Sequence, residues 1–328
     1  MTRTAAVASP VNFARYGDYS LKAPRREDGA FVRPLYRFQG RISADGSSGH
    51  PAQAGRYHLY VSLACPWAHR SVIVRALLGL EDVISLSVVD PVRDGRGWAF
   101  RDGPGHTPDP VNGFTLLREA YEATEPGYDG HVSVPVLWDK QDGRIVSNNF
   151  PDITIDLETQ FGEWATGPDL YPAALRAGID ALNDRVYATV NNGVYRCGFA
   201  TSQQAYDAAV AELFGTLDEL DRRLATRRYL FGAAITEADV RLWVTLARFD
   251  AVYVTHFKTN LRRLADYPNL WPYARDLYSI PAFGQTTNFG HIKNHYYRTH
   301  PQLNPLRIVP AGPILDWTAP HHRESLSS

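Results

Sequence analysis

Residues 57–79 read YHLYVSLACPWAHRSVIVRALLG, and this stretch decides the fold class. Its first five residues alternate as a β-strand does, whereas apolar residues recur at helical intervals after Pro66 until Gly79 closes the pattern. Proline suits the first turn of a helix because its missing N–H is not needed there. The stretch therefore predicts a strand that leads into a helix, with Cys65 at the helix N-terminus.

The rest of the chain divides into a mixed part and a helical part. After the first helix we expect a strand in VISLSVV (83–89), a long loop over 90–130, a β-hairpin over 132–148 and a further helix. From about residue 170 long amphipathic helical patterns dominate. TEAD at 236–239 predicts a helix start with a capping box.

These patterns predict an α/β thioredoxin-like domain followed by an all-α helical domain. The expected boundaries are an N-terminal extension over 1–55, the thioredoxin-like domain over 56–165, the helical domain over 170–300 and a C-terminal extension over 301–328. Both extensions are assigned from their loop-like composition and weak periodicity.

The composition narrows the classes of function. No stretch approaches the roughly 20 apolar residues of a membrane span, and a net charge of −1 without a basic block argues against nucleic acid as a partner. The first residues lack the apolar core of a secretory signal. Two distant cysteines form no disulfide framework. We expect a cytoplasmic protein that acts on small molecules, without a membrane partner.

Cys65 is the candidate nucleophile. A helix N-terminus can lower a thiol pKa from about 8.5 to roughly 3.5–7.5. The alternative is a small buried apolar residue, the interpretation that we favour for Cys197. The motif CPWA lacks the second cysteine of Cys-x-x-Cys, so an external thiol must resolve a mixed disulfide on Cys65. His69 and Arg70 either assist this thiol or face solvent.

Pro135 stands where a thioredoxin-like fold places a cis-proline opposite the active cysteine. It lies at the start of the expected third strand, in VPVLWD, a position where proline is tolerated. We expect a cis Val134–Pro135 bond, with the backbone of Val134 facing a bound thiol.

Many separate motifs together resemble one family. ACPWAHR, GWAF, VPVLWDK, NNGVYRCGFA, RFDAVYVTHFKTNLRR, YPNLWPYARDLY and NFGHIKNHYY are similar to motifs of the glutathionyl-hydroquinone reductases, the Xi class of glutathione transferases. The resemblance runs from about residue 56 to the C-terminus. It implies a glutathione transferase fold, a homodimer and a monothiol reductase that removes a thiol from S-conjugated hydroquinones or quinones through a Cys65 mixed disulfide.

The resemblance also implies the residues of the site. Tyr195, Tyr253 and Tyr296 match tyrosines that would bind the ring oxygens of the hydroquinone and favour its keto tautomer. Trp98, in the long loop, is expected to pack over the bound thiol. The expected thiol-binding residues are Pro66, Trp67, Trp98, Val134, Pro135, Asn149 and Phe150.

The chain departs from the family at one pair. Where the family usually has Glu-Ser, which hold the γ-glutamyl end of glutathione, VSNNFPDI has Asn149 and Phe150. Only four of the 34 basic side chains are lysines, which indicates GC-rich coding. Many GC-rich actinobacteria use mycothiol, in which a sugar pair replaces the γ-glutamyl end. We expect the co-substrate to be glutathione or, preferably, mycothiol.

Other interpretations stay open. The pairs His291/His295 and His321/His322 lack nearby carboxylate or cysteine partners in the sequence, so we expect no metal. A non-catalytic binding protein with a transferase fold is one alternative. Quinone conjugation or reductive dehalogenation by the same cysteine is another.

Overall fold

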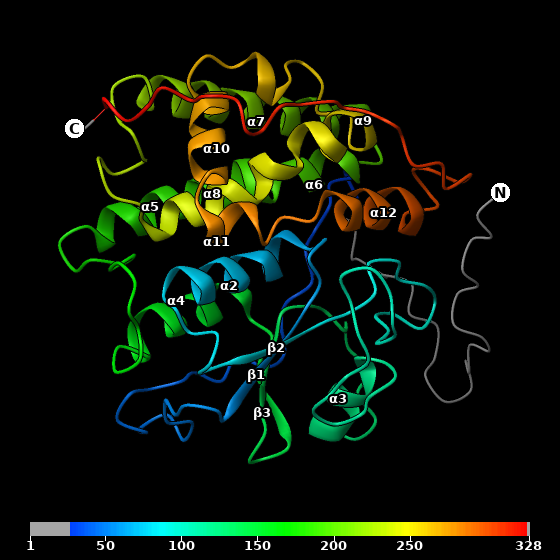
Figure 1. The fold of residues 1–328 in the computed structure, drawn as a ribbon. Coiled ribbons are helices and arrows are strands. Elements are labelled where there is room, and N and C mark those ends of the chain that lie inside the picture. The colour runs from blue at the N-terminus through cyan, green and yellow to red at the C-terminus, as the bar shows by residue number, and fades with distance from the viewer. Residues whose placement is uncertain (1–26, 327–328) are drawn as a thin grey trace.

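The computed structural model describes residues 27–326. Residues 1–26 lie outside the described part of the chain. They include the start of the chain, on which the expectation about a secretory signal rests, and nearly half of the expected N-terminal extension. Two layers of different composition are visible in Figure 1, a sheet with its helices below and a bundle of helices above. The expected pairing of an α/β half with an all-α half is confirmed.

The lower half is built on a four-stranded sheet of order β2-β1-β3-β4. The strand β1 runs parallel to β2 and antiparallel to β3, and β4 completes the expected hairpin. The helices α2 and α4 lie between this sheet and the upper half (Figure 1). The bounds are β1 (Tyr57–Val61), α2 (Pro66–Leu77), β2 (Ser85–Val88), β3 (Val136–Asp139), β4 (Arg144–Ser147) and α4 (Phe150–Gln160).

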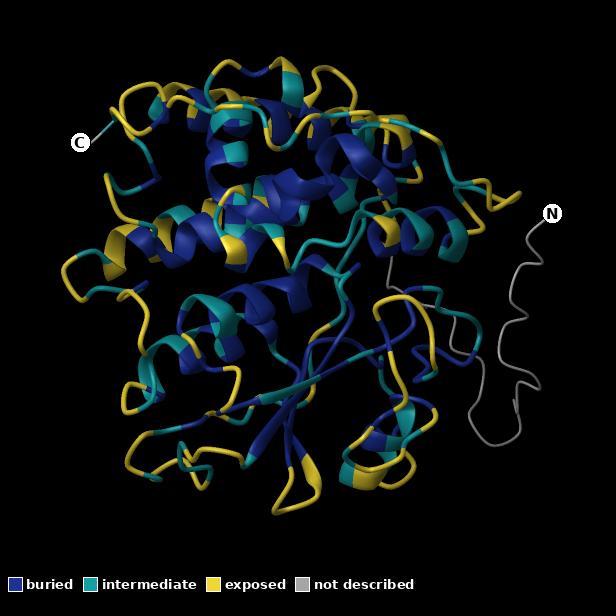
Figure 2. Cartoon of the chain, in the orientation of Figure 1, coloured by how far each residue is buried: buried dark blue, intermediate teal, exposed yellow. Residues whose placement is uncertain are grey.

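The upper half is entirely helical. Its elements are α5 (Arg176–Val186), η1 (Tyr187–Asn191), α6 (Gly193–Gly198), α7 (Gln203–Arg223), α8 (Glu237–Arg248), η2 (Phe249–Tyr253), α9 (Val254–His256), η3 (Leu264–Asp266), α10 (Leu270–Tyr278), α11 (Pro281–Gly284) and α12 (Phe289–Thr299). The helix α8 is the buried centre of this half (Figure 2) and packs against α2. Asp239 accepts hydrogen bonds from the N–H of Thr236 at 2.8 Å and from its hydroxyl at 2.9 Å, as the TEAD motif predicts.

Two helical runs contain π-turns that the sequence pattern does not reveal. The first, η1, separates α5 from α6, and the second, η2, follows α8 directly. A π-turn holds an extra residue and so changes which side chains share a helix face. Tyr253 is the last residue of η2, and the second turn therefore sets its direction.

The segment 90–130 is not a bare loop. It contains the short helix α3 (Arg118–Thr124), and α12 holds its first part in place. His295 donates from Nδ1 to the carbonyl oxygen of Pro91 at 2.7 Å, and His291 donates from Nε2 to that of Pro104 at 2.6 Å. These two histidines, one turn apart on α12, therefore fix the loop to the helical half.

The described part of the N-terminal extension contacts both halves, whereas the C-terminal segment lies against the helical half. Gln39 forms an isolated β-bridge with Ser147, and Arg41 bonds to Asp156 on α4. The C-terminal segment crosses the helical half as the red trace of Figure 1, where Trp317 packs on Trp271. The expected domain boundaries stay a prediction.

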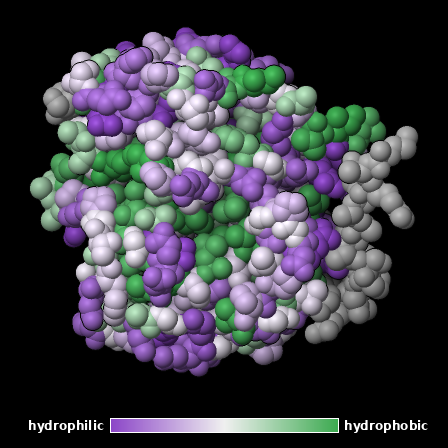
Figure 3. All heavy atoms as spheres, viewed as in Figure 1, coloured by the Kyte–Doolittle hydropathy of each residue, from purple (hydrophilic) through white to green (hydrophobic). Residues whose placement is uncertain are grey.

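Hydrophilic residues cover much of both halves on the face drawn in Figure 3, and hydrophobic residues gather near their junction. Within residues 27–326, no helix has the length and apolar character to span a membrane.

Candidate active site

A cavity of about 590 Å³ lies beside the N-terminus of α2. Both halves of the molecule line it, because α2 and the loops of the sheet supply one wall and α6 and α12 supply another. Most of the expected site residues meet here. Cys65, Pro66, Trp67, Trp98, Val134, Tyr195 and Tyr296 all line this cavity.

Cys65 occupies the N-cap position of α2, as predicted. Its Sγ lies 3.6 Å from the carbonyl oxygen of Val134, and the Val134–Pro135 bond is cis, as predicted. The surroundings of the thiol do not favour the low pKa that we expected for Cys65. Burial raises the pKa of Cys65, although the N–H of Ala68 and the guanidinium of Arg248 act against this rise.

Neither His69 nor Arg70 is directed at the thiol. His69 is buried, with Nε2 2.9 Å from the hydroxyl of Thr286, and burial lowers its pKa well below the ordinary value. Arg70 donates to Asn191 at 2.9 Å. Both residues therefore link α2 to the helical half.

Arg248, at the end of α8, is the cation that holds the turn before Cys65. Its guanidinium donates to the carbonyl oxygens of Leu63 at 3.0 Å and Ala64 at 2.9 Å. The helical half thereby positions the cysteine of the other half. Sequence reasoning did not identify this residue.

The three tyrosines bring their hydroxyl groups together. The hydroxyl of Tyr296 lies 2.5 Å from that of Tyr195 and 2.9 Å from that of Tyr253. Burial raises the pKa of all three phenols. They therefore stay protonated and can donate hydrogen bonds. Tyr195 and Tyr296 line the cavity, whereas Tyr253 lies behind Tyr296.

Trp98 forms part of the cavity wall and stacks on His295. The two ring centroids lie 5.0 Å apart with an interplanar angle of 17°. Because His295 also holds the carbonyl of Pro91, one side chain fixes both the loop and its tryptophan.

Asn149 and Phe150 are not among the residues that line the cavity. The Phe150 side chain is 1% exposed and lies behind Trp67, with ring centroids 4.5 Å apart. An apolar ring gains more from this packing than from a polar cavity. Asn149 instead donates to Asp152 at 2.7 Å. Their role in thiol selection stays a prediction.

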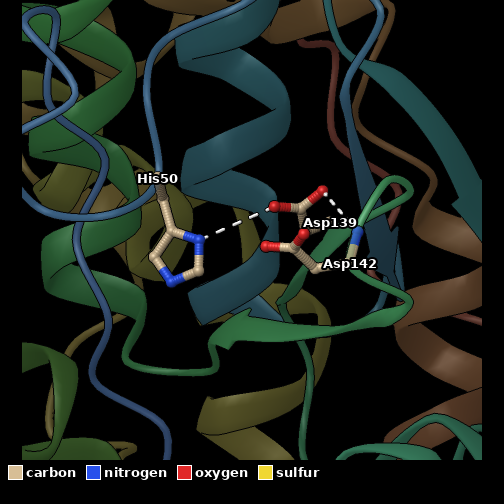
Figure 4. Close-up of side chains that lie close together, drawn as sticks. All are labelled: His50, Asp139 and Asp142. Atoms are coloured by element: carbon tan, nitrogen blue, oxygen red, sulfur yellow. Dashed lines mark hydrogen bonds and ion pairs between the residues drawn. The ribbon is translucent and has the colours of Figure 1, made fainter.

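His50, Asp139 and Asp142 lie together outside the cavity (Figure 4). Arg56 donates to Asp139 at 2.6 Å and to Asp142 at 3.1 Å. The guanidinium already pairs with both carboxylates, so the group is better described as an ion-pair cluster than as a cation site.

The first described segment contributes residues that sequence reasoning missed. Phe31, Arg33 and Tyr36 line the cavity, although their composition predicts only an extension. The available signal was the concentration of aromatic and basic side chains in FVRPLY, unusual for a loop. The cavity also includes His131, whose pKa burial lowers to about 3, so its imidazole is neutral.

Known proteins resemble this chain in both sequence and fold. Residues 64–160 match the family model of the glutathione S-transferase N-terminal domain, and residues 203–276 match that of the C-terminal domain. The chain is 49% identical to glutathionyl-hydroquinone reductase YqjG of Escherichia coli (strain K12) over 304 residues, or 90% of this chain and 93% of that protein.

Two solved structures show the same fold. The glutathione-bound structure of YqjG has a TM-score of 0.85 at 49% identity and covers 88% of this chain and 96% of that one. The Xi glutathione S-transferase of Phanerochaete chrysosporium has a TM-score of 0.87 at 48% identity, with 91% and 97% covered.

Proposed function

Because the chain belongs to the Xi class of the glutathione transferase family, we propose that it removes a low-molecular-weight thiol from S-conjugated hydroquinones. One observation carries the proposal. A cysteine at a helix start, a tryptophan wall and a cluster of protonated tyrosine hydroxyls meet around one cavity. The Escherichia coli relative is named a glutathionyl-hydroquinone reductase, which supports the same reaction.

The first step transfers the thiol to Cys65. Because its pKa is raised, the Cys65 thiol first gives up its proton to water. The thiolate attacks the sulfur of the conjugate, an S–S bond forms, and the bond between sulfur and the ring carbon breaks. The electron pair of that bond passes through the ring to the carbonyl oxygen of the keto tautomer, so the hydroquinone leaves as a phenolate, which then takes up a proton. The neighbouring tyrosine hydroxyls favour the keto tautomer in which this carbon can leave.

The second step restores the enzyme. A free thiol attacks the mixed disulfide, releases Cys65 as a thiolate and carries the former partner away as a disulfide. Cys197 cannot resolve it locally, because its side chain is 2% exposed on α6 and burial raises its pKa to about 12.

We propose mycothiol as the preferred thiol, with glutathione as the alternative. The pair that would hold the γ-glutamyl end is replaced by Asn149 and Phe150, and Phe150 is packed behind Trp67. A polar group left without its partner typically costs about 1–3 kcal/mol, and a charged amine costs more. Disulfide exchange with each thiol tests the choice, and ordinary glutathione affinity with no mycothiol adduct contradicts it.

The function is tested by single turnover of matched glutathionyl and mycothiol conjugates of one hydroquinone. Wild-type protein should release free hydroquinone and acquire one thiol adduct on Cys65, seen by mass spectrometry. Cys65→Ser should lower the release rate by about 10³-fold or more. Cys197→Ala is the control and should retain activity. Undiminished release by Cys65→Ser contradicts the mechanism.

The same assay separates the alternatives. A binding protein holds the conjugate and releases no hydroquinone, a possibility that the raised pKa of Cys65 keeps open. A dehalogenase releases halide from a chlorinated hydroquinone, and a conjugating enzyme consumes free thiol with a quinone.

The homodimer and the cytoplasmic location implied above are part of the proposal. Equilibrium sedimentation checks the dimer, and fractionation of the source cells checks the location. Both cysteines are free in the structure, which suits a reducing compartment.

A further inference from the structure

Arg33 brings a positive charge into the cavity from the first described segment. Its Cζ lies 4.5 Å from the ring centroid of Trp67 and 4.7 Å from that of Tyr195. Its Nε donates to the side-chain oxygen of Asn192 at 3.0 Å. The guanidinium is therefore held between Trp67, which lies two residues after Cys65, and Tyr195 of the hydroxyl cluster.

This cation has no anionic partner in the part of the chain that the structure describes. The group around it consists of Asn192 and the phenols of Tyr36, Tyr187 and Tyr195, and one of its terminal nitrogens is buried without a hydrogen-bond partner. A covered cation without a counter-ion costs free energy. Arg56, in contrast, has the carboxylate of Asp139 as its partner.

The proposed reaction supplies the missing anion. In the first step the negative charge of the thiolate passes from the Cys65 sulfur to a ring oxygen beside the tyrosines, so the cavity contains an anion during this step. Arg33 lies against a ring at each end of this path. A fixed cation that needs no rearrangement is an effective stabiliser of developing charge.

We propose that Arg33 is the counter-ion of the hydroquinone phenolate that leaves Cys65, so that residues outside both matched domains complete the active site. This inference rests on the proposed function and assigns a further residue to that reaction. Arg248, Tyr36, Tyr195 and Tyr253 also interact electrostatically with Cys65, and Arg93, Asp94, Arg298 and Arg307 line the same cavity. The carbonyls of Leu63 and Ala64 already engage Arg248.

The experiment measures how the rate depends on the leaving group. Conjugates of one thiol are prepared with hydroquinone rings that carry either methyl or chlorine substituents. Each conjugate is mixed with an excess of enzyme, which is full-length wild type, Arg33→Gln or Arg33→Lys. Chlorine makes the phenolate more stable and reduces its need for a counter-ion. Arg176→Gln is the matched control, because Arg176 also packs on an aromatic ring but does so on the surface. Its Cζ lies 5.0 Å from the ring centroid of Tyr171.

We expect Arg33→Gln to slow release of the methylated hydroquinone by about 10²-fold and that of the chlorinated one by distinctly less. Arg33→Lys, which keeps the charge but not the planar contact, should recover about a tenth or more of the wild-type rate. Arg176→Gln should behave as wild type.

Two outcomes overturn distinct statements. If wild type releases hydroquinone and Arg33→Gln slows both substrates equally, Arg33 is structural and this inference is wrong. If wild type releases hydroquinone from no conjugate, the proposed function itself is wrong.

Discussion

Tyr296 is the centre of the hydroxyl cluster, because its oxygen bonds to those of both Tyr195 and Tyr253. A donor fixed by two partners needs little reorganisation when charge develops on a substrate oxygen. Its position also predicts an order of importance among the three. Tyr195 and Tyr296 line the cavity, whereas the hydroxyl of Tyr253 bonds to that of Tyr296.

Tyr296→Phe tests this arrangement. We expect kcat for hydroquinone release to fall by about 10²-fold, because one preorganised donor is lost and the other two hydroxyls lose their link. Tyr253→Phe should lower kcat by only about 10-fold, since the Tyr253 hydroxyl lies one hydrogen bond further from the substrate than that of Tyr296. Steady-state release of hydroquinone measures both.

Tyr206→Phe serves as the matched control, because its hydroxyl donates to the carbonyl of Lys258 at 2.7 Å outside the cavity. It should retain wild-type kcat. A larger loss for Tyr253→Phe than for Tyr296→Phe would reverse the proposed order.

Among the elements, α12 is the one that joins the site to the segment 90–130. His291 and His295 each donate to a carbonyl of that segment, and His295 also stacks on Trp98. The wall over the expected thiol therefore depends on a helix far from it in sequence.

His291→Ala should loosen this attachment without touching the cavity wall itself. Losing one buried hydrogen bond costs about 1 kcal/mol of local stability, which is roughly five-fold faster amide exchange in the segment around Pro104. Hydrogen exchange with peptide mapping measures this. His291→Gln, which can still donate, should restore protection, and unchanged exchange in His291→Ala would show that the segment is held by other contacts.

Elements with a strong local pattern were predictable from sequence, and those set by distant packing were not. The strand and helix around Cys65 and the hairpin carry periodicity within a few residues. The π-turns η1 and η2 have no such signal, because one inserted residue does not alter the apolar pattern enough.

The candidate site shows the same division. Cys65 and Pro135 are readable from local context, whereas the tyrosines came only from the resemblance, being separated by up to 101 residues. Arg33 was missed because its partners Trp67 and Tyr195 lie far along the chain and its own segment reads as a loop.

For the whole molecule, buried polar contacts at the junction join the two halves. Arg248 binds the turn before Cys65, His69 meets Thr286, and His295 holds Pro91. Because the cavity lies at this junction, the site and the association of the halves depend on some of the same side chains.

Buried neutral histidines make this arrangement sensitive to acid. Burial lowers the pKa of His58 and His256 to about 4, that of His131 and His295 to about 3, and those of His69 and His300 well below the ordinary value. In the unfolded chain each returns to about 6.5. Below that pH the unfolded chain binds protons that the folded protein does not, so stability is present above pH 6.5 and is lost as pH falls.

Urea unfolding at pH 7.5 and pH 5.5 should therefore show a lower free energy of unfolding at the acid pH, by up to about 1.4 kcal/mol per pH unit for each such histidine. His58→Gln removes one titrating group beside the hydroxyls of Ser85 and Ser87 and should reduce this dependence by its share. His322→Gln, at an exposed position, should leave it unchanged. A free energy of unfolding that stays constant between the two pH values would show that these imidazoles accept protons in the folded state, through an opening of the junction that admits water.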